Sequence, residues 1–520
     1  MSLLPDDDTR VSSSTPRRRR RRSFTLVSHL KVSLDVVYSY KAHGTLREIP
    51  ADYHVFKFPP PPAALPKTSV SPVASFTFPD CTMAMLPRNI SCGCLPGMSS
   101  AFSYDSALNV ESAQRLYAEQ QVRPSNGLSV TPYEFAIEPQ ENSFVSLSHL
   151  TLHVKLRILD STAANGILPE GAVVAPVNDV IASLWQNIQV RINDHDFNPE
   201  SGLYPSYKSL ISKILSYNPG AAAQLSPSGF YPPDATLAAN GMDTITAKLR
   251  KKVAKSAEIS FSGALPLDIC SLDNHLSPQT KLSISLFPSS DDFFLFSNKE
   301  NTYKYKLTDI FLQYRRLSLP SPLTEKILSQ ASRVPQRYVA PYTEMKALEV
   351  PSGLTSWTLP VYPTGHVLPK QLVVAQVSSV VPNAKENPYI FKHFDLSYLA
   401  PSLDEVVPPH AEVKPDFAQK LIAREFYRLF YETGKRNTPS QSNLVTFEAF
   451  ADGAVTLFPF DLTPDKCNGG HLHSGQRAKL DMVMRWSKPL PSTITVLVYC
   501  LFDQVITIDP LSGKPSSHVF

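Results

Sequence analysis

Signatures of catalysis and of metal binding are scarce in this chain of 520 residues. It has no GxSxG, GxxxxGK[ST], HExxH or GxGxxG motif, which excludes the usual signatures of serine hydrolases, P-loop NTPases, zinc proteases and dinucleotide-binding enzymes. Six cysteines are scattered along the chain without a CxxC pair, so a disulfide framework is not indicated and reduced thiols are expected. We therefore expect no catalytic residue and no cofactor.

Charge, glycine and long apolar runs are also limited. Charged residues make up 18% of the chain, the formal net charge is +4, and there are 19 glycines against 47 prolines. A charge so nearly balanced excludes a basic binding surface over the whole molecule. No apolar run reaches the roughly 18 residues that a membrane-spanning helix needs. A hydrophobic content of 42% supports large cores, and the many prolines are more typical of β-sandwiches than of helical bundles.

Residues 1–97 differ in composition from the rest and read as an Arg/Pro-rich, partly disordered arm. Its arginine run consists of Arg17, Arg18, Arg19, Arg20, Arg21 and Arg22. Such a run can neutralise about one phosphate per side chain, so it can contact nucleic acid without reading its sequence. Dense positive charge is equally typical of a nuclear-import signal. Genome contact, nuclear import and an extension without a role all stay open.

The segment 176–217 organises the rest of the chain. Ile188, Val190 and Ile192 alternate with polar residues, which predicts a strand with one buried face. The polar residues 193–196 predict a turn. Apolar residues at three-to-four spacing then predict an amphipathic helix that can pack against the sheet of that strand. These apolar residues are Tyr207, Leu210, Ile211, Ile214 and Leu215.

Similar patterns recur in both halves of the chain. In the first half, strands are predicted near 133–137, 150–158, 258–262, 281–286, 293–296 and 303–314. In the second half they are predicted near 371–380, 389–399, 444–450, 455–460, 477–486, 493–502 and 504–508, with a helix from Asp416 to Thr433. A proline-rich break with a short helix at 323–330 separates the halves. We therefore predict two strand-rich domains, 98–325 and 326–520.

Three smaller groups of residues are candidate sites. Cys467, His471 and His473 have a spacing that can place metal ligands together, but a loop that merely contains histidines is the favoured reading. The acidic pairs Asp291-Asp292 and Asp404-Glu405 are interpreted as solvated turns rather than acid/base dyads. A second basic cluster is interpreted as a solvated loop, with nuclear import or inter-subunit contact as minor options. Its members are Lys248, Arg250, Lys251, Lys252 and Lys255.

Several blocks of the chain match one family in order. The helix segment reads YKSLISKILSY from Tyr207, residues 387–394 read NPYIFKHF, and residues 460–465 read FDLTPD. In these blocks the chain resembles the hexon-like double jelly-roll major capsid proteins of Polinton/Maverick elements and of adintovirus-like or adomavirus-like DNA viruses. The resemblance covers about 420 residues, from near Met98 onward. The family has a glutamate where this chain has Ser212, so any salt bridge of that glutamate is absent.

The resemblance implies an all-β fold of two tandem eight-stranded jelly-roll sandwiches, each with one long helical insertion. It also implies a structural protein that forms homotrimeric, pseudo-hexagonal capsomers of an icosahedral virion. Its implied partners are further copies of itself in the capsid lattice, a single-jelly-roll penton protein, minor cement proteins and packaged double-stranded DNA. The implied location is the virion capsid, with assembly in the host nucleus, and an internal membrane beneath the shell stays open.

Two other functions fit tandem sandwiches without the resemblance. One is an adhesive module that binds carbohydrate or protein, although no cluster of exposed aromatic and carboxylate side chains is evident. The other is a host-encoded protein derived from an integrated element, because the family includes elements that reside in animal chromosomes.

Overall fold

A computed structural model describes residues 116–198, 202–237, 244–272, 274–300, 302–435, 442–463, 472–473 and 475–520. The predicted arm, with its arginine run, therefore lies outside the described residues. Strands dominate the described part, which confirms the all-β prediction. No helix among the described residues is both long and apolar enough to cross a membrane.

The first sandwich consists of two four-stranded sheets. One sheet has the order β1 (Leu116–Val122), β10 (Tyr303–Ser318), β3 (Ser143–Asp160), β7 (Ile259–Ala264). The other has the order β2 (Tyr133–Ile137), β8 (Leu282–Pro288), β5 (Trp185–Ile192), β6 (His195–Phe197). Lettered B to I in chain order, these strands give sheets B-I-D-G and C-H-E-F, which is the jelly-roll topology. Strands β4 (Val174–Pro176) and β9 (Leu295–Ser297) form a separate antiparallel pair.

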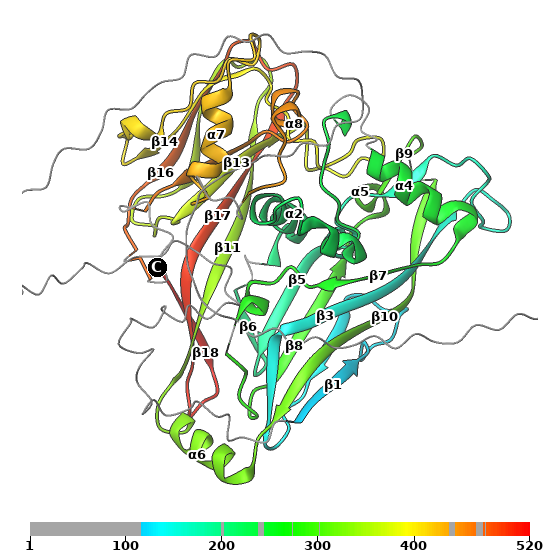
Figure 1. Ribbon diagram of the computed structural model, residues 1–520, viewed down its shortest axis with the longest axis vertical. Helices are drawn as coiled ribbons and strands as arrows, with labels where there is room; N and C mark the ends of the chain where they lie inside the picture. Colours follow the sequence, from blue (N-terminus) through cyan, green and yellow to red (C-terminus); the bar gives the residue numbers. More distant parts are fainter. Residues whose placement is uncertain are drawn as a thin grey trace, which may run out of the picture. The chain divides into compact units, whose positions relative to one another are not determined.

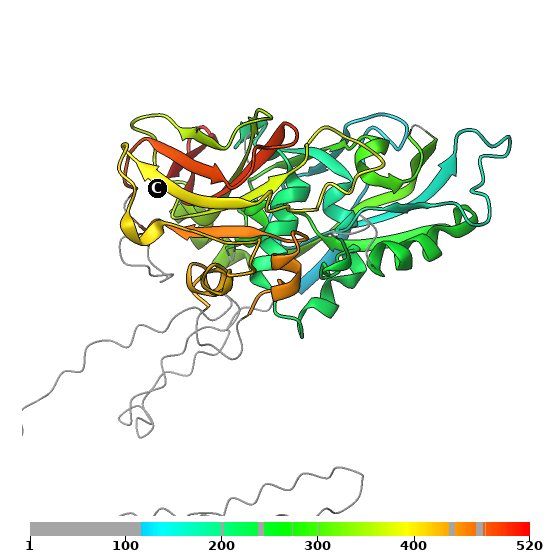
Figure 2. The same cartoon turned by 90° about the horizontal axis from the view of Figure 1, so that it is seen from above.

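The second sandwich repeats this order. One sheet contains β11 (Gln336–Val350), β17 (Ile494–Ile508), β13 (Gln371–Val377) and β15 (Leu457–Asp461), with β18 (Pro515–Val519) added beside β17. The facing sheet contains β12 (Ser356–Tyr362), β16 (Leu480–Trp486) and β14 (Leu396–Leu403). The two sandwiches lie side by side in Figures 1 and 2, within the one unit formed by residues 79–520.

The eighth strand of the second sandwich is reduced to a single bridge. Val413 pairs with Leu399 of β14 at the place that strand F occupies in the first sandwich. Pro408, Pro409 and Pro415 flank this position, and proline cannot donate to a strand ladder. The prediction of eight jelly-roll strands therefore holds in the first sandwich. Among the described residues, the second has seven of the eight, a bridge in place of the missing strand F, and the added strand β18.

The alternating patterns identify the buried faces correctly. Ile188, Val190 and Ile192 of β5 are buried, while Arg191 between them is exposed. The predicted turn after β5 is shorter than expected: it consists of Asn193 and Asp194, both at positive φ, and β6 begins at once. Asparagine and aspartate tolerate this left-handed conformation, which suits a tight hairpin.

Several predicted elements differ in the structure. The second helix, α7 (Ala423–Tyr431), begins later than Asp416. The Asp416 carboxylate instead accepts the Gln419 backbone N–H at 3.0 Å and closes a turn, and Lys420 has a φ of 55°. The strand predicted at 444–450 is wrong because Thr446 caps the short helix α8 (Phe447–Ala451). Strands β1, β11, β12 and β18 were not predicted, since their polar and apolar residues are mixed.

A further helix, α6 (Ser321–Ala331), connects β10 to β11 at the predicted break between the halves. It extends the helix predicted at 323–330 by a residue or two at each end. The predicted limit between residues 325 and 326 falls inside it.

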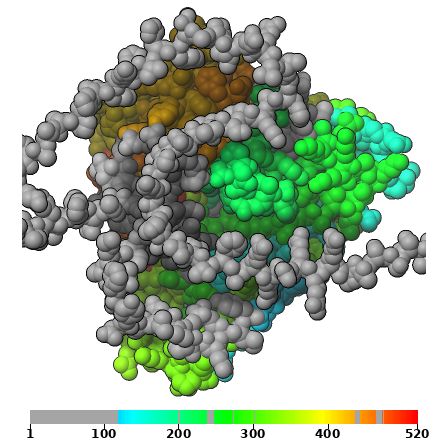
Figure 3. Space-filling view, viewed as in Figure 1, coloured from blue at the N-terminus to red at the C-terminus, as the bar shows by residue number. Residues whose placement is uncertain are grey.

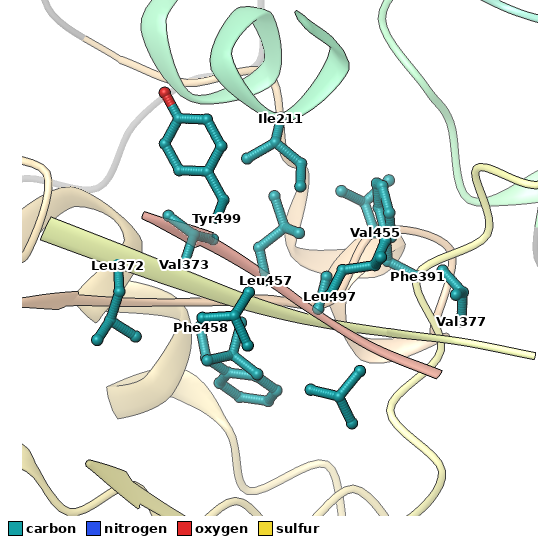
Figure 4. Packing of buried hydrophobic residues seen from close by; sticks show 14 of the residues in the cluster. Ile211, Leu372, Val373, Val377, Phe391, Val455, Leu457, Phe458, Leu497 and Tyr499 are labelled. Carbon is teal, nitrogen blue, oxygen red and sulfur yellow. The ribbon is translucent and has the colours of Figure 1, made fainter. Parts of the chain in front are cut away.

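The helix α2 (Pro205–Ser216) has the predicted apolar face but an unpredicted partner. Its five apolar residues share a hydrophobic cluster with β13 and β17 of the second sandwich. In Figure 4, Ile211 of α2 and Tyr499 of β17 lie on one side of the sheet, while Leu372 and Phe458 point to the other. The predicted contact of this helix with the sheet of β5 is present, but its apolar face also covers the neighbouring sandwich, which the sequence pattern does not predict.

The cores of the two sandwiches also exchange residues in the other direction. Tyr338, Ala340, Ile506 and Ile508, at the far ends of β11 and β17, belong to the hydrophobic cluster of the first sandwich. Each core is thus completed by side chains from the other sandwich. We infer that the two sandwiches stabilise one another and unfold together.

Ile211→Asp tests this inference. Ile211 is 0% exposed, so a carboxylate there is desolvated in an apolar contact and should lower the free energy of unfolding by at least about 3 kcal/mol. Urea unfolding, followed by the fluorescence of Trp185 in the first sandwich and Trp486 in the second, should show both transitions moving together. Ser216→Asp, at an exposed position of the same helix, should cost less than about 1 kcal/mol. Movement of only the Trp185 transition would contradict the shared core.

Candidate functional site

The residues weighed as metal ligands or acids do not form a reactive centre in the described structure. Cys467 and His471 lie outside the described residues, and the His473 backbone N–H lies 3.5 Å from the Asp503 carboxylate. Within the described ranges, no group of three or more His, Cys, Asp or Glu side chains could hold a metal ion. The metal hypothesis therefore gains no support.

The two acidic pairs have structural partners. Asp291 begins the short helix α5 (Asp291–Phe294), and its carboxylate accepts the Tyr305 backbone N–H at 3.0 Å. Asp404 lies in a turn with positive φ, and its carboxylate accepts the Lys479 backbone N–H at 2.8 Å. Interpretation as a turn is confirmed for Asp404-Glu405, whereas Asp291-Asp292 starts a helix.

The second basic cluster lies mostly on a helix rather than in a loop. The helix α4 (Thr244–Val253) buries Leu249 and Val253, which are four residues apart on one face. Arg250 donates hydrogen bonds to the carbonyl oxygens of Gly171 and Ala172. The interpretation of this cluster as a loop is therefore wrong, although its four lysines are exposed to solvent as expected.

A network of buried polar groups lies at the junction of the two sandwiches. Asp179, which is 0% exposed, lies directly before the short helix α1 (Val180–Ser183). Its two carboxylate oxygens accept from Lys213 Nζ and from Ser209 Oγ of α2, each at 2.7 Å. A buried carboxylate is tolerated when it is paired and hydrogen-bonded in this way. These hydrogen bonds fix the orientation of α2 about its own axis relative to the first sandwich.

A second polar group joins α2 to the second sandwich. Lys208 Nζ donates to the Thr343 carbonyl oxygen of β11 at 3.1 Å. The Asp268 carboxylate, in the first sandwich, accepts from the Thr343 backbone N–H at 2.8 Å and from its hydroxyl at 2.7 Å. Burial lowers the pKa of Lys208, while the nearby Asp268 opposes that shift. These bonds cross the junction, so they hold one sandwich in a specific register against the other.

An aromatic cluster completes the junction. Tyr389 of the second sandwich packs edge-to-face against Tyr207 of α2, with ring centroids 5.5 Å apart, and against Phe293 at 6.3 Å. Its hydroxyl is hydrogen-bonded to Ser183 of α1. Burial raises the pKa of Tyr389, so the hydroxyl stays neutral and available for this bond. Tyr389 belongs to the NPYIFKHF block and Tyr207 to the helix segment. Their contact therefore brings these two sequence blocks together at the junction.

The end of α2 is held by Lys435. Its ammonium group donates to the carbonyl oxygens of Leu215 and Ser442, and the Leu444 backbone N–H donates to the Ile214 carbonyl oxygen at 2.9 Å. These bonds satisfy carbonyl groups that the end of a helix leaves without intrahelical partners. Burial lowers the pKa of Lys435 to about 8. The hydrogen bonds of Asp179, Lys208, Tyr389 and Lys435 all hold secondary-structure elements together, so the role of the junction is structural.

Comparison with known proteins supports the fold. No family profile matches the sequence, and the comparison with curated proteins gives no match. A chain of the Sputnik virophage, solved by cryo-electron microscopy, is similar with a TM-score of 0.53 and 10% identity, over 80% of this chain and 90% of that chain. The mavirus major capsid protein is similar with a TM-score of 0.47 and 11% identity, over 81% and 94% of the two chains.

The chain thus has the double jelly-roll fold expected from its resemblance to hexon-like major capsid proteins. Each sandwich has the same strand order, and the Sputnik similarity extends over both of them. The placement among Polinton-, adintovirus- or adomavirus-like groups remains a prediction.

The pKa of Lys435 yields a test of the junction. Its folded-state pKa of about 8 lies below its ordinary value of 10.5. Between these pH values the unfolded chain keeps a proton that the folded chain has released, so this group makes stability rise with pH. The melting temperature of the parent protein relative to Lys435→Met should therefore increase from pH 7 to pH 9.5. Lys514→Met, at an exposed position, should show no such change, and a constant difference for Lys435→Met would refute the effect of partial burial on Lys435.

Proposed function

We propose that the chain is a structural, non-enzymatic protein, the major capsid protein of an icosahedral DNA virus. The observation that carries this proposal is the pair of jelly-roll sandwiches joined through α2, in a fold shared with a chain of the Sputnik virophage. A shell protein needs rigid blocks with fixed lateral faces and no reactive centre. The junction provides such a block, because Asp179, Lys208 and Tyr389 are buried there and engaged in bonds between elements.

The assembly unit in this proposal is a homotrimer. Three copies place six similar sandwiches around a threefold axis, which makes a pseudo-hexagonal capsomer. Contacts between unlike faces propagate and close into a ring when the rotation per copy fits. Further contacts between capsomers then build the capsid lattice.

The same proposal assigns partners and location. The chain would contact a single-jelly-roll penton protein, minor cement proteins and packaged double-stranded DNA within the virion capsid. Assembly would take place in the host nucleus. The arginine run Arg17–Arg22 would serve DNA contact or nuclear import.

We also propose the domain limits 1–97 for the arm, 98–325 for the first jelly roll and 326–520 for the second. The limit between the two jelly rolls is supported by the end of β10, the last long strand of the first sandwich, at Ser318 and the start of β11 at Gln336.

Sedimentation equilibrium of the purified protein tests the homotrimer. The expected mass is about three times the 57.6 kDa of the chain, and a chain beginning at Met98 should give the same oligomer if the arm is dispensable for folding. A stable monomer that binds immobilised glycans would contradict the proposal and favour an adhesive module.

Replacement of Arg17–Arg22 by serine tests the arm. Loss of six positive charges should weaken retention on double-stranded DNA and reduce the salt dependence of log K by roughly 5, since each phosphate contact contributes about 0.9. Nuclear accumulation should fall instead if the run is an import signal. Lys326→Ser with Lys514→Ser, at exposed positions outside both basic clusters, is the control for loss of positive charge. Unchanged DNA retention and unchanged accumulation would leave the run without either role.

A further inference from the structure

The two sandwiches carry equivalent helical insertions. In the first, α2 lies between strands F (β6) and G (β7). In the second, α7 lies between the bridge at Val413, which replaces strand F, and strand G (β15). The two helices thus stand at the same place in the topology of their sandwiches.

The first helix has its docking partner within the chain. It covers the outer face of the sheet that contains strands D (β13) and I (β17) of the following sandwich. Residues 371–377 of β13 are consequently buried on both faces, apart from Gln371. This contact is heterologous, because a helix of one sandwich meets a sheet of the next.

The second helix buries only the side that faces its own sandwich. Arg428 forms an ion pair with Glu432 at 3.0 Å, and the Glu432 carboxylate accepts the Asp461 backbone N–H of β15 at 2.9 Å. On the opposite side, Tyr427 is 50% exposed and Tyr431, one turn further on, is 40% exposed.

More apolar surface adjoins these two tyrosines. Phe447 of α8 is 37% exposed and packs edge-to-face against Phe426 of α7, with centroids 5.3 Å apart. The α7–α8 region is coloured orange in the space-filling view of Figure 3. We call Tyr427, Tyr431 and Phe447 the α7 aromatic face. Tyrosine-rich surface of this kind is typical of protein interfaces.

The first sandwich has the matching sheet, and Lys155 and Arg157 on its outer face are exposed in the described structure. Its strands D and I are β3 and β10, whose outward residues His153 and Phe311 stack with centroids 4.7 Å apart. The Arg123 guanidinium lies 5.7 Å from the Phe311 ring centre. A cavity of about 340 Å³ opens beside these rings, lined also by Lys155, Ser260 and Asp309. This surface, the β3–β10 face, combines stacked rings with polar and cationic groups that suit tyrosine rings and hydroxyls.

We propose that the α7 aromatic face of one copy docks onto the β3–β10 face of a second copy. The contact repeats between copies the one that α2 makes within the chain, and it rests on the proposed homotrimer. Each copy offers one helix and one sheet face, so the contacts close into a ring without leaving either surface uncovered. Around the ring, contacts between the two sandwiches of one chain then alternate with contacts between sandwiches of neighbouring copies.

Site-specific photocrosslinking tests this contact. A benzophenone amino acid replaces Tyr427 in the full-length chain, and isotopically light and heavy copies are mixed before irradiation so that crosslinks between copies are recognised by mass. The expected product joins position 427 of one copy to a peptide from residues 143–160 or 303–318 of another. The same probe at Leu511, which is 92% exposed, should not react with those peptides.

The outcomes separate the contact from the homotrimer. A trimeric mass with crosslinks only to other regions overturns the proposed contact and leaves the capsid proposal intact. A monomeric mass overturns the homotrimer itself. As a second readout, Tyr427→Ser with Tyr431→Ser should raise the concentration at which the trimer dissociates by about 100-fold or more, since central interface rings often contribute about 30-fold each. Leu511→Ser should leave that concentration unchanged, and an unaltered double variant would refute the contact.

Discussion

The docking of α2 onto the outer face of the β13–β17 sheet is the interaction on which the rest of the structure depends. Five apolar side chains of this helix belong to one hydrophobic cluster with residues of the second sandwich. Full burial of one such side chain contributes about 1.5–3 kcal/mol, so together they are comparable with the whole net stability of a typical domain. Hydrogen bonds from polar groups around the helix fix its orientation, which apolar contacts alone do not. Asp179 holds one side of α2, and Lys208 reaches the backbone of β11 from another.

The combination of apolar burial and hydrogen bonds at α2 is suited to a structural function, which needs no reactive motif. Apolar burial alone would allow the sandwiches to slide over one another, because such contacts are not directional. The hydrogen bonds at Thr343 and Tyr389 require one register. Copies that pack around an axis need a fixed angle between the two sandwiches of each chain. This fixed angle is the property that we propose for a capsid subunit.

Much of the fold could be predicted from the sequence, and the misses have physical causes. Period-two alternation identified β3 and β5, and three-to-four spacing identified the apolar face of α2, because both patterns report which side of an element is buried. Neither pattern reports what covers it. The sequence does contain one indication that a helix covers β13. Residues 372–377 of this strand read LVVAQV, and a nearly continuous apolar run is typical of a strand buried on both faces. The late start of α7 depends on a turn closed by the Asp416 side chain, which reads in sequence like a helix cap.

A cryo-electron microscopy map of particles formed by the full-length protein tests the central claim most directly. The account predicts capsomers with six jelly rolls in three covalent pairs, with α2 buried inside each pair against the β13–β17 sheet. A map in which the two sandwiches of one chain lie apart, with α2 exposed between them, would contradict the account.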